Sequence, residues 1–273
     1  KNKSTPFNMA LSIGFHNSYH QAGPFGAIVQ QYERSYPNLT QQLDLGMRDI
    51  ELDVHYDPIS GNFLVYHIEG IDARSSCKCL HQCIQQIQDW MGQHSNHTPI
   101  LLRIEPRGMK TGSLWCDYES KGSVTHQLID QLYRAFQKNL YTPKDLIGHV
   151  KWGNRTHTVI DAIRERGGWP SMHSLSGRII LTWNFFGESS HCRNIYMSKN
   201  VDAKYHILFD RVAEDAGGSA EGLIAELRAN KGNLKRRADN RYAAFLQCDV
   251  SVSSSHRNNG FHTRIKDRSR PPM

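Results

Sequence analysis

The stretch Ile50-Glu51-Leu52-Asp53-Val54-His55 decides the fold, because charged and apolar residues alternate along it. Successive side chains of an extended strand point to opposite faces, so Glu51, Asp53 and His55 share one face and the apolar residues between them share the other. Three ionisable groups on an inward face need a cation or a proton-transfer task to offset their burial. The stretch therefore predicts a strand whose polar face belongs to a functional site.

Strand-like apolar runs alternate with segments of helical periodicity along the rest of the chain. The runs read as mostly buried parallel strands over residues 10–14, 47–54, 62–67, 100–104, 178–183, 205–209 and 245–250. Helices are predicted over residues 80–91, 124–139, 158–166 and 220–230. This alternation predicts an α/β fold of the TIM-type (β/α)8 barrel class. The length of 273 residues suits one barrel, so we expect residues 1–273 to form a single domain.

Polar groups fall at the ends of several of these runs, which is where barrels collect their active-site residues. The set is His16, Asn17, Glu51, Asp53, His67 and Glu105. Its carboxylate and amide oxygens suit a hard cation such as Ca²⁺, and its two histidines can move protons near neutral pH. Most of the other histidines, His20 and His55 among them, are expected at the surface or in local hydrogen bonds. The set predicts a metal-assisted phosphodiester site.

Arg103 and Glu105 lie two residues apart in a predicted strand and share its inward face. An internal ion pair between them is one interpretation. The presence of Glu51 and Asp53 favours the interpretation of Glu105 as a metal ligand, because three carboxylates and the Asn17 carbonyl leave positions for water and a phosphate oxygen. We assign Arg103 to substrate binding.

The six cysteines form an even set without a zinc-type pair of CxxC motifs. Up to three disulfides, and hence an exported protein, is the favoured interpretation; reduced buried thiols in a cytosolic protein are the alternative. The cysteines allow 15 pairings, and the sequence does not choose among them.

A formal charge of +7 and a pI near 9.1 suggest an anionic partner, either an anionic lipid surface or a phosphorylated substrate; a basic surface with no specific partner is the alternative. Nucleic acid is disfavoured, because the basic residues are dispersed outside two short clusters and no RNA-binding signature occurs. No apolar stretch approaches the roughly 20 residues that span a bilayer, and the mean hydropathy is -0.58, so we expect a soluble protein. We also expect a monomer.

Several motifs together carry a family resemblance. Residues 14–20 (GFHNSYH), 42–54 (QLDLGMRDIELDV), Tyr66-His67 and Ile104-Glu105 resemble the catalytic motifs of the phosphoinositide-specific phospholipase C superfamily, in particular its calcium-dependent, microbial-type members. The likeness continues through residues 168–180 and 235–239, so it covers most of the chain.

The resemblance implies roles for the individual residues. Calcium would be held by Asn17, Glu51, Asp53 and Glu105. The substrate's inositol 2-hydroxyl would attack phosphorus, with Glu51 or another carboxylate as base. His67 would protonate the departing diacylglycerol oxygen and His16 would hydrogen-bond the phosphoryl group. Lys235 and Arg237 match the family's basic pair and are assigned to substrate binding. The products would be diacylglycerol and an inositol phosphate formed through a cyclic intermediate.

A second resemblance points to the sphingomyelinase D type phospholipases, which share the barrel, usually use Mg²⁺ and act on choline- or ethanolamine-bearing lipids. It rests on the Cys77-x-Cys79-x-x-x-Cys83 spacing and on residues 110–114. Asn17 after His16, and Glu105 in place of Asp, favour the calcium-dependent phospholipase C. Either likeness allows a Cys77–Cys83 loop, with Cys79 bonded to a distant partner.

Two further alternatives stay open, a glycerophosphodiester phosphodiesterase and a lipid- or glycan-binding barrel without activity. For the favoured enzyme we expect secretion and peripheral attachment to a phospholipid membrane. The segment 23–29 is the candidate attachment loop, through insertion of Phe25, Ile28 and Val29. A short helix packed on the barrel rim is the alternative for that segment.

Overall fold

The computed structural model describes residues 5–10, 12–28, 32–108, 112–117, 119–148, 159–183, 190–197, 205–214 and 243–248. Val29, the predicted helix over residues 220–230, and the basic residues Lys235 and Arg237 lie outside the described residues.

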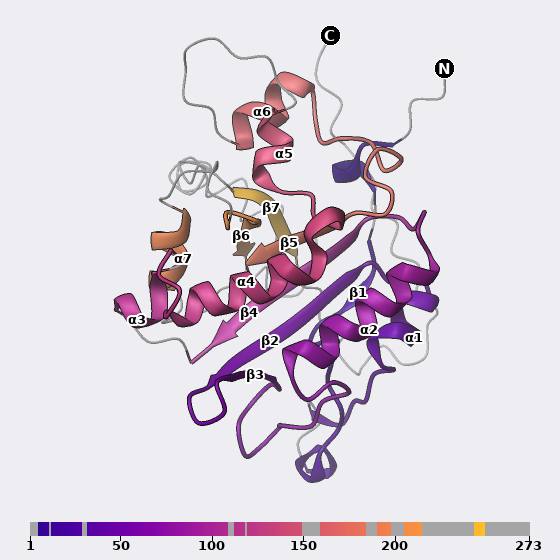
Figure 1. The fold of residues 1–273 in the computed structure, drawn as a ribbon. Helices are drawn as coiled ribbons and strands as arrows, with labels where there is room; N and C mark the ends of the chain where they lie inside the picture. Colours follow the sequence, from indigo (N-terminus) through magenta and orange to yellow (C-terminus); the bar gives the residue numbers. More distant parts are fainter. Residues whose placement is uncertain are drawn as a thin grey trace.

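The described residues form a seven-stranded sheet in which six strands run parallel in chain order (Figure 1). These are β1 (Gly14–Phe15), β2 (Asp49–Asp57), β4 (Ile100–Arg107), β5 (Ile179–Trp183), β6 (Leu208–Glu214) and β7 (Ala243–Cys248). Each parallel neighbour needs a crossover, so the order confirms the predicted alternation of strands and helices. In the part of the chain that the structure describes, no pairing between β1 and β7 closes the sheet.

The helices are α1 (Leu39–Asp44), α2 (Leu80–Gln93), α3 (Ser113–Cys116), α4 (Val124–Phe136), α5 (Pro143–Gly148), α6 (Val159–Arg166) and α7 (Ser190–Met197). Short 3₁₀ turns are η1 (Phe7–Met9), η2 (Pro24–Ala27) and η4 (Gln137–Asn139). Figure 1 shows α2 and α4 lying across one face of the sheet. Ser123 begins α4 by accepting a hydrogen bond from the His126 backbone N–H.

The strand predicted over residues 62–67 exists as β3 (Asn62–Val65), but it pairs antiparallel with β2, so its assignment to the parallel set was wrong. The reason is the short connection after Asp57, because a parallel neighbour needs a crossover of a dozen or more residues. Asp57 accepts hydrogen bonds from the backbone N–H groups of Ile59 and Ser60, and Gly61 takes a positive φ of 70°. These features favour a hairpin.

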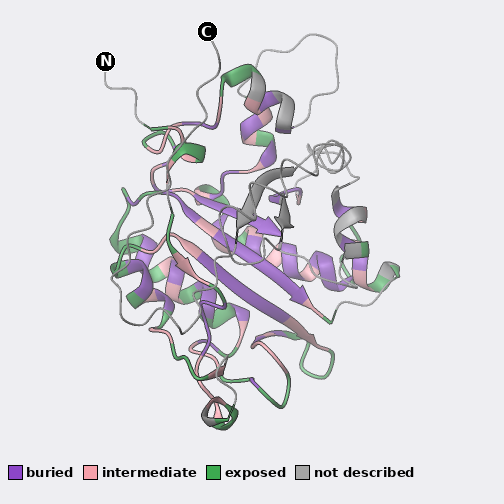
Figure 2. Ribbon diagram, turned by 180° about the vertical axis from the view of Figure 1, so that it is seen from behind, coloured by how far each residue is buried: buried purple, intermediate pink, exposed green. Residues whose placement is uncertain are grey.

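Figure 2 shows β2 and β4 buried along most of their length. The core combines aliphatic side chains of the strands with large aromatic groups, among them Trp183, Tyr196 and Phe209, which are fully buried. Burial on this scale is the main source of stability for a sheet covered by helices. Against this apolar background, the buried charges of β2 and β4 stand out.

Two disulfides are present among the described residues, Cys77–Cys83 and Cys116–Cys192. The first confirms the predicted loop, and the second joins α3 to α7. Cys79 is a free thiol, so the expectation of a distant disulfide partner was wrong. Its position explains this, because Cys79 lines a shallow hollow whose other described lining residues include Asn62 and Gln127 but no cysteine. None of the described helices combines the length and apolar character needed to cross a bilayer.

Gly14 offers a test of how closely β1 approaches β2. A Cβ atom at this position would lie 1.8 Å from the carbonyl oxygen of Asp49, which is backbone and cannot move aside cheaply. We expect Gly14→Ala to lower the free energy of unfolding by about 3 kcal/mol or more, measured by urea denaturation. Gly92→Ala is the control, because nothing lies within 4 Å of its Cβ position, and an equally mild effect of both variants would contradict the close approach.

Candidate active site

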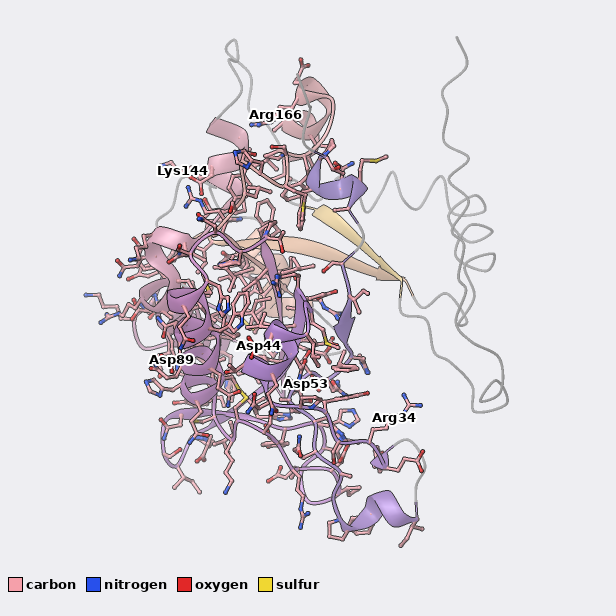
Figure 3. All side chains as sticks on the ribbon, turned by 90° about the vertical axis from the view of Figure 1, so that its right-hand side faces the viewer. Arg34, Asp44, Asp53, Asp89, Lys144 and Arg166 are labelled. Carbon is pink, nitrogen blue, oxygen red and sulfur yellow. A yellow bond between two sulfur atoms is a disulfide. The ribbon has the colours of Figure 1, made fainter. Side chains whose placement is uncertain are left out.

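The polar side chains of β2 and β4 meet because the two strands are paired in register. Asp53 lies beside Glu105, and Glu51 lies beside Arg103. All four side chains point to the inward face and are at most 4% exposed. Figure 3 places Asp53 at the same end of the molecule as the loop that carries Arg34, away from Lys144 and Arg166. The predicted inward face of the 50–55 stretch is therefore the floor of a site.

The turn after β1 brings His16 and Asn17 to this floor. Asn17 adopts a left-handed backbone with φ of 54°, a conformation that asparagine tolerates better than most residues, and its N–H donates to Glu51 Oε2 at 3.2 Å. Ser18 fixes the turn, because its hydroxyl donates to the Phe15 carbonyl and accepts from the Glu51 backbone N–H. His16 Nε2 lies 3.8 Å from Glu51 Oε2, and the His16 side chain is 61% exposed.

Two arginines neutralise part of the buried negative charge. Arg103 Nε donates to Asp49 at 2.7 Å, and its guanidinium lies 3.5 Å from Glu51. Glu105 instead pairs with Arg107, whose Nη2 lies 2.6 Å from Glu105 Oε1 and 3.0 Å from Asp53 Oδ2. Burial raises the pKa of Asp53 to about 7, and Glu51 acts in the same direction while Arg107 opposes the shift.

The donor set fits a calcium ion. The side-chain oxygens Asn17 Oδ1 and Asp53 Oδ1 are buried and have no hydrogen-bond partner, which is costly unless a cation or water satisfies them. Carboxylate and amide oxygens are the ligands that Ca²⁺ prefers. Within the described ranges, no three acidic, histidine or cysteine side chains converge at ligating distance, and the Arg107 guanidinium lies against two of the carboxylates.

His67 follows β3 and is held by a carboxylate that lies five residues further along the chain. Its Nδ1 is 2.9 Å from Asp72 Oδ2, and the Asp72 side chain is almost fully buried. A carboxylate only accepts, so Nδ1 carries the hydrogen in this contact and Nε2 is the nitrogen that can exchange a proton elsewhere. Burial lowers the pKa of His67, and the hydrogen bond and charge of Asp72 oppose that shift.

His20 lies on the far side of Asp72. Its Nε2 is 2.8 Å from Asp72 Oδ1, and its Nδ1 is 2.7 Å from the carbonyl oxygen of Arg34. The Asp72 carboxylate and the Arg34 carbonyl oxygen are both acceptors, so His20 is held between two acceptors and ties Asp72 to the loop that carries Arg34. His20 occupies one side of the buried Asp72 carboxylate, and His67 occupies the other.

The structure adds Asp72, His20 and Arg107 to the predicted set. Arg107 carries a periodic signal, since it stands two residues after Glu105 on the same strand face. Asp72 lies in a loop, so no periodic pattern in the sequence could have identified it. His20 was expected at the surface or in a local hydrogen bond, and this was wrong: it is buried and bonded to Asp72, which lies 52 residues further along the chain. His55 Nε2 contacts the Tyr66 carbonyl oxygen at 2.9 Å, across the β2–β3 hairpin.

Comparison with known proteins decides the family. Residues 63–267 match the family described as Ca²⁺-dependent phosphoinositide phospholipase C, which is well over half of the 273-residue chain. The chain belongs to this family. The match includes His67 and Glu105 but begins after His16, Asn17, Glu51 and Asp53. No curated protein is detectably similar to the chain.

Solved structures of similar fold include a calcium-dependent phosphoinositol-specific phospholipase C from Pseudomonas sp., with 21% identity, a TM-score of 0.59, and coverage of 89% of this chain and 75% of the other. A second Pseudomonas sp. structure, a myo-inositol complex, has 22% identity, a TM-score of 0.56, and coverage of 80% and 70%. A Ca²⁺-dependent phosphatidylinositol-specific phospholipase C from Streptomyces antibioticus has 20% identity, a TM-score of 0.54, and coverage of 74% and 65%.

These matches confirm several expectations. The fold is that of the PLC-like α/β barrel phosphodiesterases. Membership of the family makes the chain an enzyme of the phosphoinositide phospholipase C class and identifies calcium as its metal. The Mg²⁺ alternative is therefore set aside.

Asp72 provides a test of the His67 geometry. Because Asp72 raises the pKa of His67, Asp72→Asn should lower that pKa further, measured by NMR titration of the His67 ring. If His67 must be protonated to act, the falling limb of the pH–rate profile should move to lower pH and turnover should drop about tenfold or more. Asp89→Asn, at an exposed hydrogen bond to Gln85, is the control. An unchanged His67 titration in Asp72→Asn would contradict the contact.

Proposed function

We propose that the enzyme cleaves phosphatidylinositol-type phospholipid to diacylglycerol and inositol phosphate through a cyclic phosphate, outside the cell and at a membrane surface. One observation supports the proposal above the rest: His67, held through Nδ1 by Asp72, lies within electrostatic reach of His16 and of Arg107, the arginine that pairs with the buried Asp53 and Glu105. Family membership supplies the substrate class. The proposal treats residues 1–273 as one barrel domain.

Calcium would be held by Asn17, Glu51, Asp53 and Glu105, oxygen donors that follow β1 or lie on the inward face of β2 and β4. A calcium ion held there would lower the pKa of the inositol 2-hydroxyl and neutralise charge on the phosphoryl oxygens. Arg103 keeps Glu51 in place through their ion pair, which is its proposed contribution to substrate binding. Lys235 and Arg237 remain proposed substrate contacts.

The chain's own groups account for the proton transfers. A carboxylate, Glu51 or another of the cluster, takes the proton of the inositol 2-hydroxyl as its oxygen bonds to phosphorus. The bond from phosphorus to the diacylglycerol oxygen breaks, and protonated His67 gives its Nε2 proton to that oxygen. His16, largely exposed beside Glu51, donates a hydrogen bond to the phosphoryl group. Water then opens the cyclic phosphate, with His67 as the base.

The membrane surface is proposed to lie around η2. The segment contains the short 3₁₀ helix η2, as the alternative expected. Phe25 and Ile28 are 44% and 80% exposed, however, so these two side chains are not packed on the rim. Ile71, 47% exposed, belongs to the loop against which Gly23 packs. In Figure 1, η2 protrudes at the lower end of the molecule, the end to which β2 runs. Exposed apolar groups at the mouth suit insertion into a lipid interface.

Product analysis tests the proposed reaction. Phosphorus NMR on vesicles of phosphatidylinositol should show calcium-dependent appearance of inositol cyclic phosphate and inositol phosphate, with none in EDTA. His16→Ala and His67→Ala should each reduce turnover on the order of 10²-fold or more. Choline release from sphingomyelin or lysophosphatidylcholine would assign the enzyme to the phospholipase D type, and near wild-type turnover of either variant would remove that histidine from the mechanism.

Vesicle sedimentation tests the proposed attachment loop. The double variant Phe25→Ala, Ile28→Ala should bind phosphatidylinositol vesicles about tenfold more weakly, because two exposed apolar side chains are lost from the interface. The matched control is Met9→Ala, Leu45→Ala, which removes apolar groups that are 61% and 69% exposed on the N-terminal side of β1 and β2. Equal binding by wild type and the first variant would exclude the loop.

A further inference from the structure

Arg107 is in contact with two of the proposed calcium ligands. Its Nη2 is 2.6 Å from Glu105 Oε1 and 3.0 Å from Asp53 Oδ2, and its Nε donates to the same Asp53 oxygen at 3.1 Å. The guanidinium therefore bridges two carboxylates from neighbouring strands. It supplies one positive charge, whereas a calcium ion in the proposed site would supply two.

The guanidinium and a calcium ion are incompatible in this arrangement. Calcium binds carboxylate oxygens at about 2.3–2.6 Å, so an ion on Asp53 and Glu105 would lie within a few ångströms of Arg107. Two cations at that separation repel strongly in a partly buried site. The other proposed donors, Asn17 Oδ1 and Asp53 Oδ1, remain unsatisfied beside the guanidinium, so Arg107 does not complete the site.

The Arg107 side chain also has room to move away from the two carboxylates. It is the last residue of β4, and its side chain is 33% exposed, whereas those of Asp53 and Glu105 are 0% and 2% exposed. The long, flexible side chain can turn toward the mouth of the site without moving the strand. Arg103 differs, because its side chain is only 5% exposed and is fixed by Asp49 and Glu51.

We propose that Arg107 is an internal competitor for calcium: it neutralises Asp53 and Glu105 in the metal-free enzyme, leaves them when calcium binds, and thereby sets the calcium affinity. Turned toward the mouth, its guanidinium meets the phosphate of the substrate. This inference rests on the proposed function, because it takes Asp53 and Glu105 as calcium ligands.

Calorimetric titration of the metal-free full chain with Ca²⁺, without lipid, tests the inference. Arg107→Gln should bind calcium about tenfold more tightly, because the competing charge is gone. Its melting temperature should fall below that of the wild type in EDTA and recover in saturating calcium. Arg107→Lys should give an intermediate affinity and serves if Arg107→Gln does not fold. Arg34→Gln, which removes an outward-pointing charge at the same end of the molecule, should change the affinity less than twofold, roughly the range of screened surface charges (Figure 3).

The outcomes separate this inference from the proposed function. If Arg107→Gln binds calcium no more tightly than the wild type while Asp53→Asn binds it more weakly, the competitor role is wrong and the ligand set stands. If Asp53→Asn leaves calcium binding unchanged, the ligand set itself is wrong. If Arg34→Gln tightens binding as much as Arg107→Gln, the effect comes from the overall charge and direct competition is overturned.

Discussion

The architecture of the site depends on the cost of burying carboxylates inside a sheet. Glu51, Asp53 and Glu105 are nearly inaccessible to solvent, and an isolated charge in such surroundings is strongly unfavourable. The chain offsets this cost locally, with Arg103 against Glu51 and Arg107 against Asp53 and Glu105. The compensation is incomplete, since Asp53 retains a raised pKa and an unsatisfied oxygen. That deficit is what a calcium ion of this enzyme family would fill.

The histidine side of the site follows the same rule. Asp72 is a buried carboxylate that is hydrogen-bonded to His20 on one side. On the other side it fixes the orientation of His67. The acidic floor and the His67 support therefore use one principle, in which a basic side chain lies against each buried carboxylate and only the groups facing the mouth are free to change partners.

Much of this arrangement follows from sequence periodicity. The alternation along residues 50–55 places Glu51 and Asp53 inward, and the same period on β4 places Arg103 and Glu105 beside them. Strand register, which brings Asp53 next to Glu105, is a tertiary property that a single sequence does not contain. The antiparallel hairpin of β3 depends on the length of one turn, and Asp72 depends on the path of a loop, so neither could be predicted from a repeating pattern. Cys79 shows the same limit, because cysteine spacing does not determine which sulfur atoms face each other.

The most direct test of the account is a crystal structure of the calcium-loaded enzyme with the anomalous signal of the metal measured. The account predicts a single strong peak at about 2.3–2.6 Å from oxygens of Asn17, Glu51, Asp53 and Glu105, with His67 Nδ1 still against Asp72. A peak outside this cluster, or full calcium-dependent activity in crystals with no peak there, would contradict it.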